Sequence, residues 1–232
     1  MAVPLAMGWR HLLFENYRVD PNLVERKLPA CLNVDTFDGH AWLSIVPFTN
    51  VHVRPYPLPG VFGIELPELN LRTYVEHDGE PGVYFFSLDA DGLLSVIGAR
   101  LFHHLPYFYA SISLRETDGR VAFESRRRHP GARPAAYRAV YEPLGDEFFA
   151  RERGLPRFLF ERYRLFTEDP QHRLRETVVD HDPWAVQRSQ ATVETNTLLS
   201  AMGFAGVNGP PVYFYSRGVD VVASRSRRRC WT

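Results

Sequence analysis

Alternating apolar and polar residues recur in short stretches along the chain, and this pattern predicts a protein built mainly from β-strands. The clearest stretch is residues 68–75, ELNLRTYV. Successive side chains of a strand point to opposite faces, so one predicted face carries Glu68, Asn70, Arg72 and Tyr74, and the other carries Leu69, Leu71 and Val75. The polar face either meets solvent or lines the interior of a curved sheet. In the second interpretation, Glu68 and Arg72 would share a ligand carboxylate or a proton.

Turn and capping residues divide the rest of the chain into further elements. Asp20 followed by Pro21 predicts the start of a short helix that Pro29 would end. Asp-Gly pairs at 38–39 and 118–119 predict hairpin turns. The other expected elements are a long ordered loop at 52–67, two strands around a turn at 77–82, a short helix-like segment at 93–98, a short helix at 145–154, strands at 162–168 and 173–184, a strand and then a helix ending at Gly203 within 190–204, and a final strand pair at 211–224.

Many short strands with few helices predict an α+β domain that is mostly antiparallel β, with a curved sheet or barrel around a cavity. The chain has no convincing βαβ series and no phosphate-binding loop. Its 232 residues, of which 45% are hydrophobic, are enough for one domain with a full core. We expect a single domain over residues 1–222 and a flexible basic tail over residues 223–232.

Charge and targeting patterns limit the classes of partner. The 27 basic and 27 acidic residues give a formal net charge of zero, so no nucleic-acid partner is expected. The N-terminus lacks the pattern of a signal peptide, and no apolar run approaches the roughly 18 residues of a membrane span. These features predict a cytoplasmic protein with no membrane partner.

Lysine, cysteine and motif usage restrict the chemistry. Lys27 is the only lysine in the chain, so any mechanism that needs a lysine amine has one candidate. The two cysteines, Cys31 and Cys230, predict neither a disulfide framework nor a cysteine-based metal site, which favours a reducing compartment. No strong metal-ligand spacing and no Gly-x-Ser-x-Gly motif occur. We therefore predict no metal, no cofactor and no serine-hydrolase activity.

Residues 98–110, GARLFHHLPYFYA, are the second stretch of candidate chemistry. In an extended conformation, His103, Tyr107 and Tyr109 share one face while His104 lies on the other, so the adjacent histidines would not bind one metal ion. The residues alone leave two interpretations open. The stretch is either an aromatic strand of the core or a strand that lines a binding site.

Two further polar stretches have simpler interpretations. DHDPW, residues 180–184, matches no strong metal signature and is interpreted as a strand end with Trp184 packed inward. SRRRHPGARP, residues 125–134, is interpreted as a solvated basic loop, although it would also suit the guidance of an anionic ligand.

Several segments in order resemble the uncharacterised bacterial family DUF2071, also called the YqjF-like family. They are residues 9–48, PELNLRTYV at 67–75, GVYFFSLDA at 82–90, the stretch 98–110, RYRL at 162–165 and HDPW at 181–184. The resemblance covers roughly residues 8–222. The family has no established general activity, but it is similar to acetoacetate decarboxylase. The resemblance therefore implies a cone-shaped, mostly antiparallel β-barrel with a few flanking helices.

The likeness to the decarboxylase also implies positions for a site. Glu68 falls on the active-site glutamate, while Arg100 and Pro106 match the frame of the catalytic loop. The two lysines of that loop fall on Tyr107 and Phe108. The first of these lysines forms a Schiff base with the keto acid and the second lowers the pKa of the first, so the substitutions exclude Schiff-base acetoacetate decarboxylation here.

What remains is a cavity site without lysine. The resemblance implies that Glu68 acts as an acid or base and that Tyr107 donates a hydrogen bond to a carbonyl or enolate oxygen. The expected substrate-binding residues are Asn70, Arg72, Arg100, His103 and Tyr109. Either arginine would orient a carboxylate, and Arg100 has an alternative role as a buried structural residue. Lys27 does not match the catalytic position and is interpreted as a surface residue.

Two classes of function stay open. One is a lysine-independent enzyme acting on a small carbonyl or carboxylate compound, such as a lyase, hydratase or isomerase. The other is a non-catalytic protein that binds a small apolar or acidic ligand, and a structural or oligomeric role is a third alternative. A buried Glu68 with a shifted pKa beside Tyr107 would favour the enzyme, whereas Glu68 tied to Arg72 would favour binding or structure. Self-association is expected by likeness to the decarboxylase relatives.

Overall fold

The computed structural model describes residues 3–92, 107–152, 154–169, 171–204, 207 and 209–231. The segment predicted to be helix-like at 93–98 and the candidate residues Arg100 and His103 lie outside these ranges. The described part of the chain is mostly β-structure with a few short helices, which confirms the predicted fold class.

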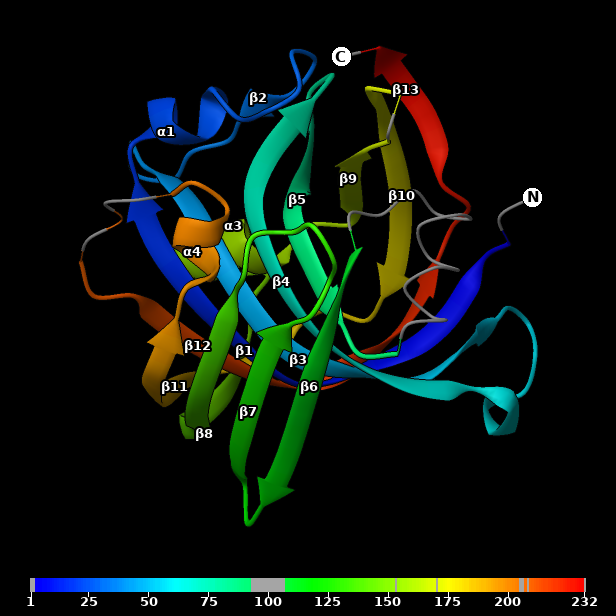
Figure 1. Cartoon of the computed structure of the whole chain (residues 1–232), viewed down its shortest axis with the longest axis vertical. Coiled ribbons are helices and arrows are strands. Elements are labelled where there is room, and N and C mark those ends of the chain that lie inside the picture. Colours follow the sequence, from blue (N-terminus) through cyan, green and yellow to red (C-terminus); the bar gives the residue numbers. More distant parts are fainter. Residues whose placement is uncertain are drawn as a thin grey trace.

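The elements follow one another in the order labelled in Figure 1. The strands are β1 (Leu5–Val19), β2 (Asn33–Val34), β3 (Ala41–Pro55), β4 (Ile64–His77), β5 (Glu80–Ala90), β6 (Tyr107–Thr117), β7 (Arg120–Arg127), β8 (Ala136–Phe149), β9 (Arg164–Glu168), β10 (Arg173–His181), β11 (Ala185–Asn196), β12 (Val212–Ala223) and β13 (Arg227–Trp231). The helices are α1 (Pro21–Glu25), α3 (Gly154–Phe160) and α4 (Leu198–Ala201), with one turn of 3-10 helix at Gly60–Phe62. As predicted, Asp20 caps α1, because its side chain accepts a hydrogen bond from the Asn22 N–H.

All strands belong to one sheet, which closes on itself (Figure 1). Hydrogen-bonded neighbours run from β5 through β6, β7, β8, β11, β12, β1, β3 and β4 back to β5, and we call this circuit the large ring. A second circuit, the small ring, runs from β5 through β9, β10, β12, β1, β3 and β4. Most pairs are antiparallel, but β5 pairs in parallel with both β6 and β9. The strands β12, β1, β3, β4 and β5 therefore form a wall between two interiors.

Each face of the shared wall packs a different core. One apolar cluster draws on strands of the large ring and includes Leu13, Leu43, Leu71, Phe123 and Tyr137. The other draws on strands of the small ring and on α3, and it includes Phe14, Trp42, Tyr74, Leu88, Phe160 and Trp184. The predicted alternation within β4 is present, since Leu69 and Leu71 join the first cluster and Tyr74 joins the second. Trp184 is buried, as predicted for the stretch DHDPW.

Paired irregularities in β1 and β12 keep both halves of these long strands facing the correct core. His11 has φ 56° and Gly218 has φ 136°, and Arg10 is the residue paired with Gly218. A Cβ on Gly218 would lie 1.9 Å from the Trp9 carbonyl oxygen, so only glycine fits this crossing. In β1, odd-numbered residues point into the small-ring core before His11, and even-numbered residues do so after it.

Three local predictions fail because long-range strand pairing overrides them. The Asp38–Gly39 turn is present, but β2 pairs with β4 and not with β3, so no hairpin forms between the segments that flank the turn. The long loop predicted at 52–67 is shortened to 56–63, because β3 continues beside β1 to Pro55 and β4 begins at Ile64. Residues 145–149 extend β8, and Phe148 and Phe149 pair with β11, where a helix was predicted.

The hairpin at Asp118–Gly119 and the strand-then-helix order of β11 and α4 are confirmed. The predicted final strand pair at 211–224 is instead one strand, β12. The tip of the arm between β3 and β4 exposes apolar side chains, namely Tyr56, Leu58, Val61, Phe62 and Ile64.

The basic tail is also ordered as a strand. Residues 227–231 were expected to be flexible, but they form β13 and pair with β10. Arg229 donates to Glu176 of β10. Cys31 and Cys230 form a disulfide that joins the segment after α1 to β13, although the sequence predicted no disulfide framework. The cysteine usage therefore no longer supports a reducing compartment.

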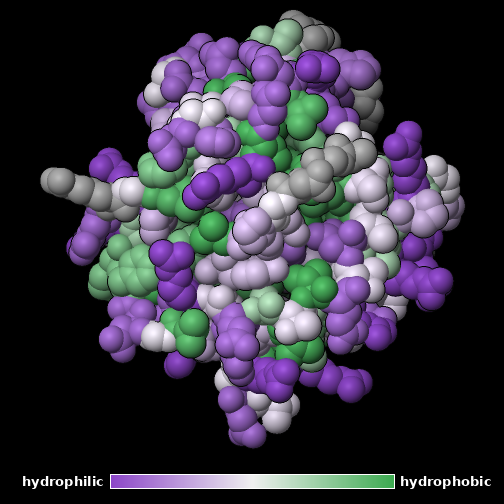
Figure 2. All heavy atoms as spheres, turned by 90° about the vertical axis from the view of Figure 1, so that its left-hand side faces the viewer, coloured by the Kyte–Doolittle hydropathy of each residue, from purple (hydrophilic) through white to green (hydrophobic). Residues whose placement is uncertain are grey.

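The side of the molecule that bears α1 and α4 is covered largely by hydrophilic residues, with apolar residues in small separate groups (Figure 2). Within the described residues, no helix has both the length and the apolar character needed to cross a bilayer.

Candidate functional site

Glu68 lies on β4, next to the β5 edge of the shared wall, and faces the small ring. Its neighbours across the sheet are Phe48 of β3 and Ala90 of β5. The residue is 4% exposed, so its carboxyl group has left bulk water. A carboxyl group in such a position keeps its charge only if hydrogen bonds or a cation replace the lost solvent.

Three side chains donate hydrogen bonds to the Glu68 carboxylate. The Tyr107 hydroxyl donates to Oε2 at 2.8 Å, and Asn50 Nδ2 donates to the same oxygen at 3.3 Å. Asn70 Nδ2 donates to Oε1 at 3.4 Å. The structure thus brings together Glu68, Tyr107 and Asn70 of the predicted site. Asn50 was not predicted, although a polar residue after the apolar run of β3 was a visible signal.

Burial dominates the electrostatics of this group. It raises the pKa of Glu68 from 4.5 to about 7, even though the hydrogen bonds from Tyr107, Asn70 and Asn50 oppose the rise. The pKa of Tyr107 lies well above its ordinary value because of burial and the adjacent Glu68 charge. Near neutral pH, Glu68 therefore exchanges between its two protonation states while the phenol stays protonated.

Two buried polar atoms on the Glu68 face of β4 have no partner within the described part of the chain. Asn70 Oδ1 and Arg72 Nε are both buried and make no hydrogen bond. The Arg72 guanidinium lies 5.3 Å from the ring centre of Phe14 and 5.9 Å from that of Tyr74. The described ion pairs include none between Glu68 and Arg72. One free acceptor and one free donor therefore lie on the same strand face, two residues apart.

The remaining predicted residues are placed only in part. Tyr109 is half-buried on β6, two residues beyond Tyr107, and its N–H donates to His129 Nδ1. Arg100 and His103 lie outside the described residues. Lys27 is exposed, as expected, and its Nζ donates to the Met202 carbonyl at the end of α4.

A second buried carboxylate lies on the other face of the same strands and was not predicted. Asp89 of β5 accepts hydrogen bonds from Arg127 Nη2 at 2.6 Å and Nε at 3.0 Å, and from the Ser87 hydroxyl at 2.9 Å. The Arg127 guanidinium lies 4.1 Å from the ring centre of Phe108. Tyr107 and Phe108, which the sequence resemblance matched to the two decarboxylase lysines, are thus directed to opposite sides of the wall.

A third buried carboxylate, Glu15 of β1, is also on the large-ring face. The Tyr137 hydroxyl donates to its Oε2 at 2.8 Å, and the Tyr17 hydroxyl donates to its Oε1. Burial raises the pKa of Glu15, and hydrogen bonds from Tyr17, Tyr137 and Asn196 oppose the rise. Both oxygens have donors, so this group is saturated by the chain itself.

No cluster suited to a metal ion occurs in the described ranges. There, no three residues among His, Cys, Asp and Glu come together in a way that would hold one. The donors around Glu68 are two amides and one phenol, which suits an oxygen-bearing organic ligand better than a metal ion.

The comparisons with solved structures concern the fold. Acetoacetate decarboxylase from Legionella pneumophila matches with a TM-score of 0.71 and 14% identity, covering 99% of this chain and 88% of that one. The enduracididine biosynthesis enzyme MppR complexed with pyruvate matches with a TM-score of 0.68 and 14% identity, covering 98% and 91%. An acetoacetate decarboxylase-like enzyme from Sphingomonas wittichii matches with a TM-score of 0.67 and 15% identity, covering 100% and 95%. The chain therefore has the acetoacetate decarboxylase-like fold.

The comparisons with sequences concern the family. The uncharacterized protein YqjF of Bacillus subtilis is 39% identical over 215 residues, which cover 92% of this chain and 88% of that protein. Residues 6–220 match the family DUF2071, which is described as an uncharacterized conserved protein. The chain belongs to the DUF2071 family.

Proposed function

We propose that this protein binds a small carbonyl or carboxylate compound at Glu68 and acts on it by acid–base chemistry that needs no lysine. The observation that carries the proposal is the Glu68 carboxyl group, which is buried, has a pKa raised to about 7 and has no cation in contact among the residues that the structure describes. General acids and bases work best when their pKa lies near the working pH.

The proposed step is removal of a proton from the carbon next to the ligand carbonyl. The ionised Glu68 carboxylate takes the proton, the electron pair of the C–H bond forms a carbon–carbon double bond, and the carbonyl π electrons move to oxygen. Once protonated, Glu68 is a weaker acceptor for the hydrogen bond from Tyr107. The Tyr107 hydroxyl then turns to the new enolate oxygen and stabilises it.

The two unpartnered atoms suggest how such a ligand is oriented. The Arg72 guanidinium is a fitting partner for a ligand carboxylate, and Asn70 Oδ1 is a fitting acceptor for a ligand hydroxyl or enol proton. A buried donor and a buried acceptor that lack partners each cost free energy, so a ligand that satisfies both gains affinity. The pyruvate complex of MppR supports the choice of a small keto acid as a probe for this fold.

The test is exchange of the methyl protons of pyruvate and of the C3 protons of 2-oxobutyrate with solvent D2O, followed by proton NMR. We expect catalysed exchange whose rate rises with pH through about 7, as Glu68 ionises. Glu68→Gln should abolish the exchange, and Tyr107→Phe should slow it by about 100-fold, because one donor to the enolate oxygen is lost.

Glu15→Gln is the matched control, since it also removes a buried carboxylate that accepts from a phenol, but on the large-ring face. Exchange by this variant should equal that of the wild type, after thermal melts confirm that it is folded. Saturable binding of the keto acids without exchange would overturn catalysis and support the non-catalytic alternative. Neither binding nor exchange would overturn the site.

A further inference from the structure

A second concave site lies where the sheet branches, away from Glu68. Phe214 and Tyr215 of β12 pair with β11, whereas residues 221–223 pair with β10. Between these two stretches, β12 keeps β1 as its partner on one side and leaves β11 on the other. A cavity of about 600 Å³ opens at this point, and we call it the branch-point cleft. Its lining residues are Arg10, Glu147, Ala185, Gln187, Arg217 and Gly218.

One cation of the cleft is already neutralised by the chain. Arg10 forms an ion pair with Asp220, and its Nη1 donates to the carbonyl oxygens of Trp9 and Val219, at 2.9 Å each. Gly8 makes room for this arrangement, since a Cβ there would lie 2.7 Å from Arg10 Nη1. The backbone and Asp220 therefore hold Arg10 as a fixed part of the wall.

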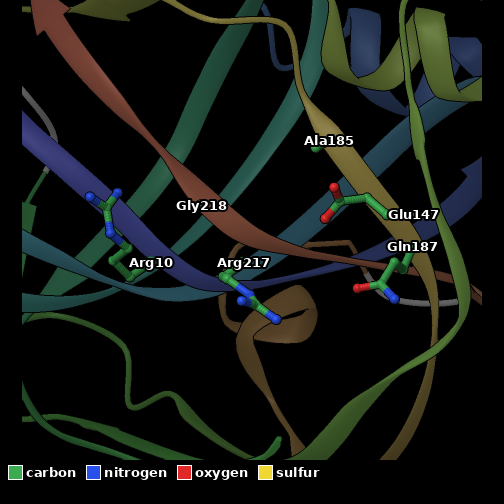
Figure 3. Close-up of a pocket in the computed structure, with 6 residues that line it drawn as sticks. All are labelled: Arg10, Glu147, Ala185, Gln187, Arg217 and Gly218. Carbon is green, nitrogen blue, oxygen red and sulfur yellow. The ribbon is translucent and has the colours of Figure 1, made fainter.

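The other two charges are not neutralised. Arg217 of β12 and Glu147 of β8 are both exposed, and the described hydrogen bonds and ion pairs include none for either side chain. Gln187 Nε2 donates to the Gly145 carbonyl at 2.8 Å, which holds the amide in place and leaves Oε1 as an acceptor. Figure 3 shows the side chains of Glu147, Gln187 and Arg217 extending from different strands toward one space.

The charge pattern selects among ligand classes. A simple anion would gain from Arg217 but would be repelled by Glu147, and a simple cation would meet the reverse arrangement. A molecule that carries both charges can pair with Arg217 and Glu147 at the same time. The guanidinium presents paired N–H donors to a carboxylate, while the Glu147 carboxylate and the Gln187 carbonyl oxygen are acceptors for an ammonium group.

We propose that the branch-point cleft binds a small zwitterion of the amino-acid type, with its carboxylate on Arg217 and its ammonium group on Glu147. The inference is independent of the proposed chemistry at Glu68, because none of the residues around Glu68 lines the cleft. The cleft therefore provides a separate ligand site on the opposite edge of the shared wall.

The experiment is a titration of the full-length, isotope-labelled protein, followed by amide chemical-shift changes. The zwitterionic probes are glycine, β-alanine and 4-aminobutyrate, which differ in the separation of their charges. Butyrate and butylammonium are matched probes with one charge each. We expect saturable shifts at residues 185–187 and 216–218 for at least one zwitterion, and about tenfold weaker binding for both single-charge probes.

Variants separate this site from general surface charge. Arg217→Gln and Glu147→Gln should each weaken zwitterion binding about tenfold, whereas Glu68→Gln should leave it unchanged. The exchanged pair Arg217→Glu with Glu147→Arg should recover binding, since the two charges only change places. Absence of saturable shifts at millimolar probe, or equal binding of butyrate and 4-aminobutyrate, would overturn the proposal and leave an ordinary solvated groove.

Discussion

Two buried carboxylates on adjoining positions of the shared wall have opposite surroundings. Glu68 of β4 pairs across the sheet with Ala90, and the next residue, Leu69, pairs with Asp89. Asp89 faces a guanidinium that donates to both of its oxygens. Glu68 faces a phenol and two amides, with no cation in contact among the described residues. Within the described residues, a neutralised carboxylate and a carboxylate with no cation in contact are thus one strand position apart, on opposite faces of the sheet.

The difference explains which of the two groups is suited to chemistry. Burial raises the pKa of Asp89, and the Arg127 hydrogen bonds and charge oppose that rise directly. Proton transfer at Asp89 would leave the Arg127 charge buried and unpaired, which is costly. Glu68 has no cationic partner among the described residues, so it gains or loses a proton near neutral pH at little cost. Among the described residues, the ion pair therefore fixes the charge of Asp89, whereas the lack of a cation beside Glu68 lets that carboxyl group change its protonation state.

Arg127→Met removes the cation that pairs with Asp89 and should have the largest effect on stability. It leaves Asp89 buried without its cation, so we expect the free energy of unfolding to fall by about 3–5 kcal/mol. Chemical denaturation measures this loss. The control is Arg126→Met on the same strand, which removes an exposed arginine and should change stability by less than about 0.5 kcal/mol. Equal losses in the two variants would contradict a special role for the buried pair.

Glu68→Gln should change how the stability of the protein depends on pH. The folded-state pKa of Glu68 is raised to about 7, above its unfolded value of 4.5, so the folded protein binds the proton more tightly. Stability from this group is full below about pH 4.5 and is lost as the pH rises through 7. Wild type should lose about 3 kcal/mol relative to Glu68→Gln over this interval, because each tenfold change in proton affinity is worth about 1.4 kcal/mol.

The measurement for this second prediction is the difference in unfolding free energy between wild type and Glu68→Gln at pH 5 and at pH 8. Taking the difference removes the contributions of other groups, including Glu15, whose pKa is also raised. A difference that stays constant across this range would show that the pKa of Glu68 is not raised.

Arg72→Met removes the arginine on the Glu68 face and should have the smallest effect on stability. The guanidinium lies over aromatic rings and has a buried Nε without a partner, and among the described residues it forms no ion pair that its removal would break. We expect a change of less than about 1 kcal/mol in unfolding free energy, in contrast to Arg127→Met. The same variant should weaken keto-acid binding about tenfold, measured by titration calorimetry. A stability loss equal to that of Arg127→Met would assign Arg72 to the structure instead.

Local sequence signals predicted part of the fold. The alternation over residues 68–75, the cap at Asp20 and the turn at Asp118–Gly119 are all present, because periodicity and turn chemistry depend on neighbouring residues only. Residues 145–149 misled the prediction, since their local preference is helical while pairing with β11 holds them extended. Strand pairing is set by distant partners, and no local pattern reports it.

The site shows the same division. Family resemblance singled out Glu68 and Tyr107, and the alternation placed Asn70 and Arg72 on the face of Glu68. Neither signal revealed Asn50, which reaches Glu68 from the neighbouring strand across a separation of 18 residues. Resemblance also placed Tyr107 and Phe108 at the former lysine positions. Only the pairing of β6 with β5 directs the first to Glu68 and the second beneath Arg127.

The sequence by itself determined the strand-rich class, the polar face of β4 and the presence of a single lysine, Lys27, because composition, period and residue identity are local properties. Tertiary structure decided the closure of the sheet into two rings, the Cys31–Cys230 disulfide and the ordering of β13. It also decided which carboxylate obtained a cation. Charge and burial at one residue depend on strands far away in the chain, so the pKa of Glu68 is a property of the fold.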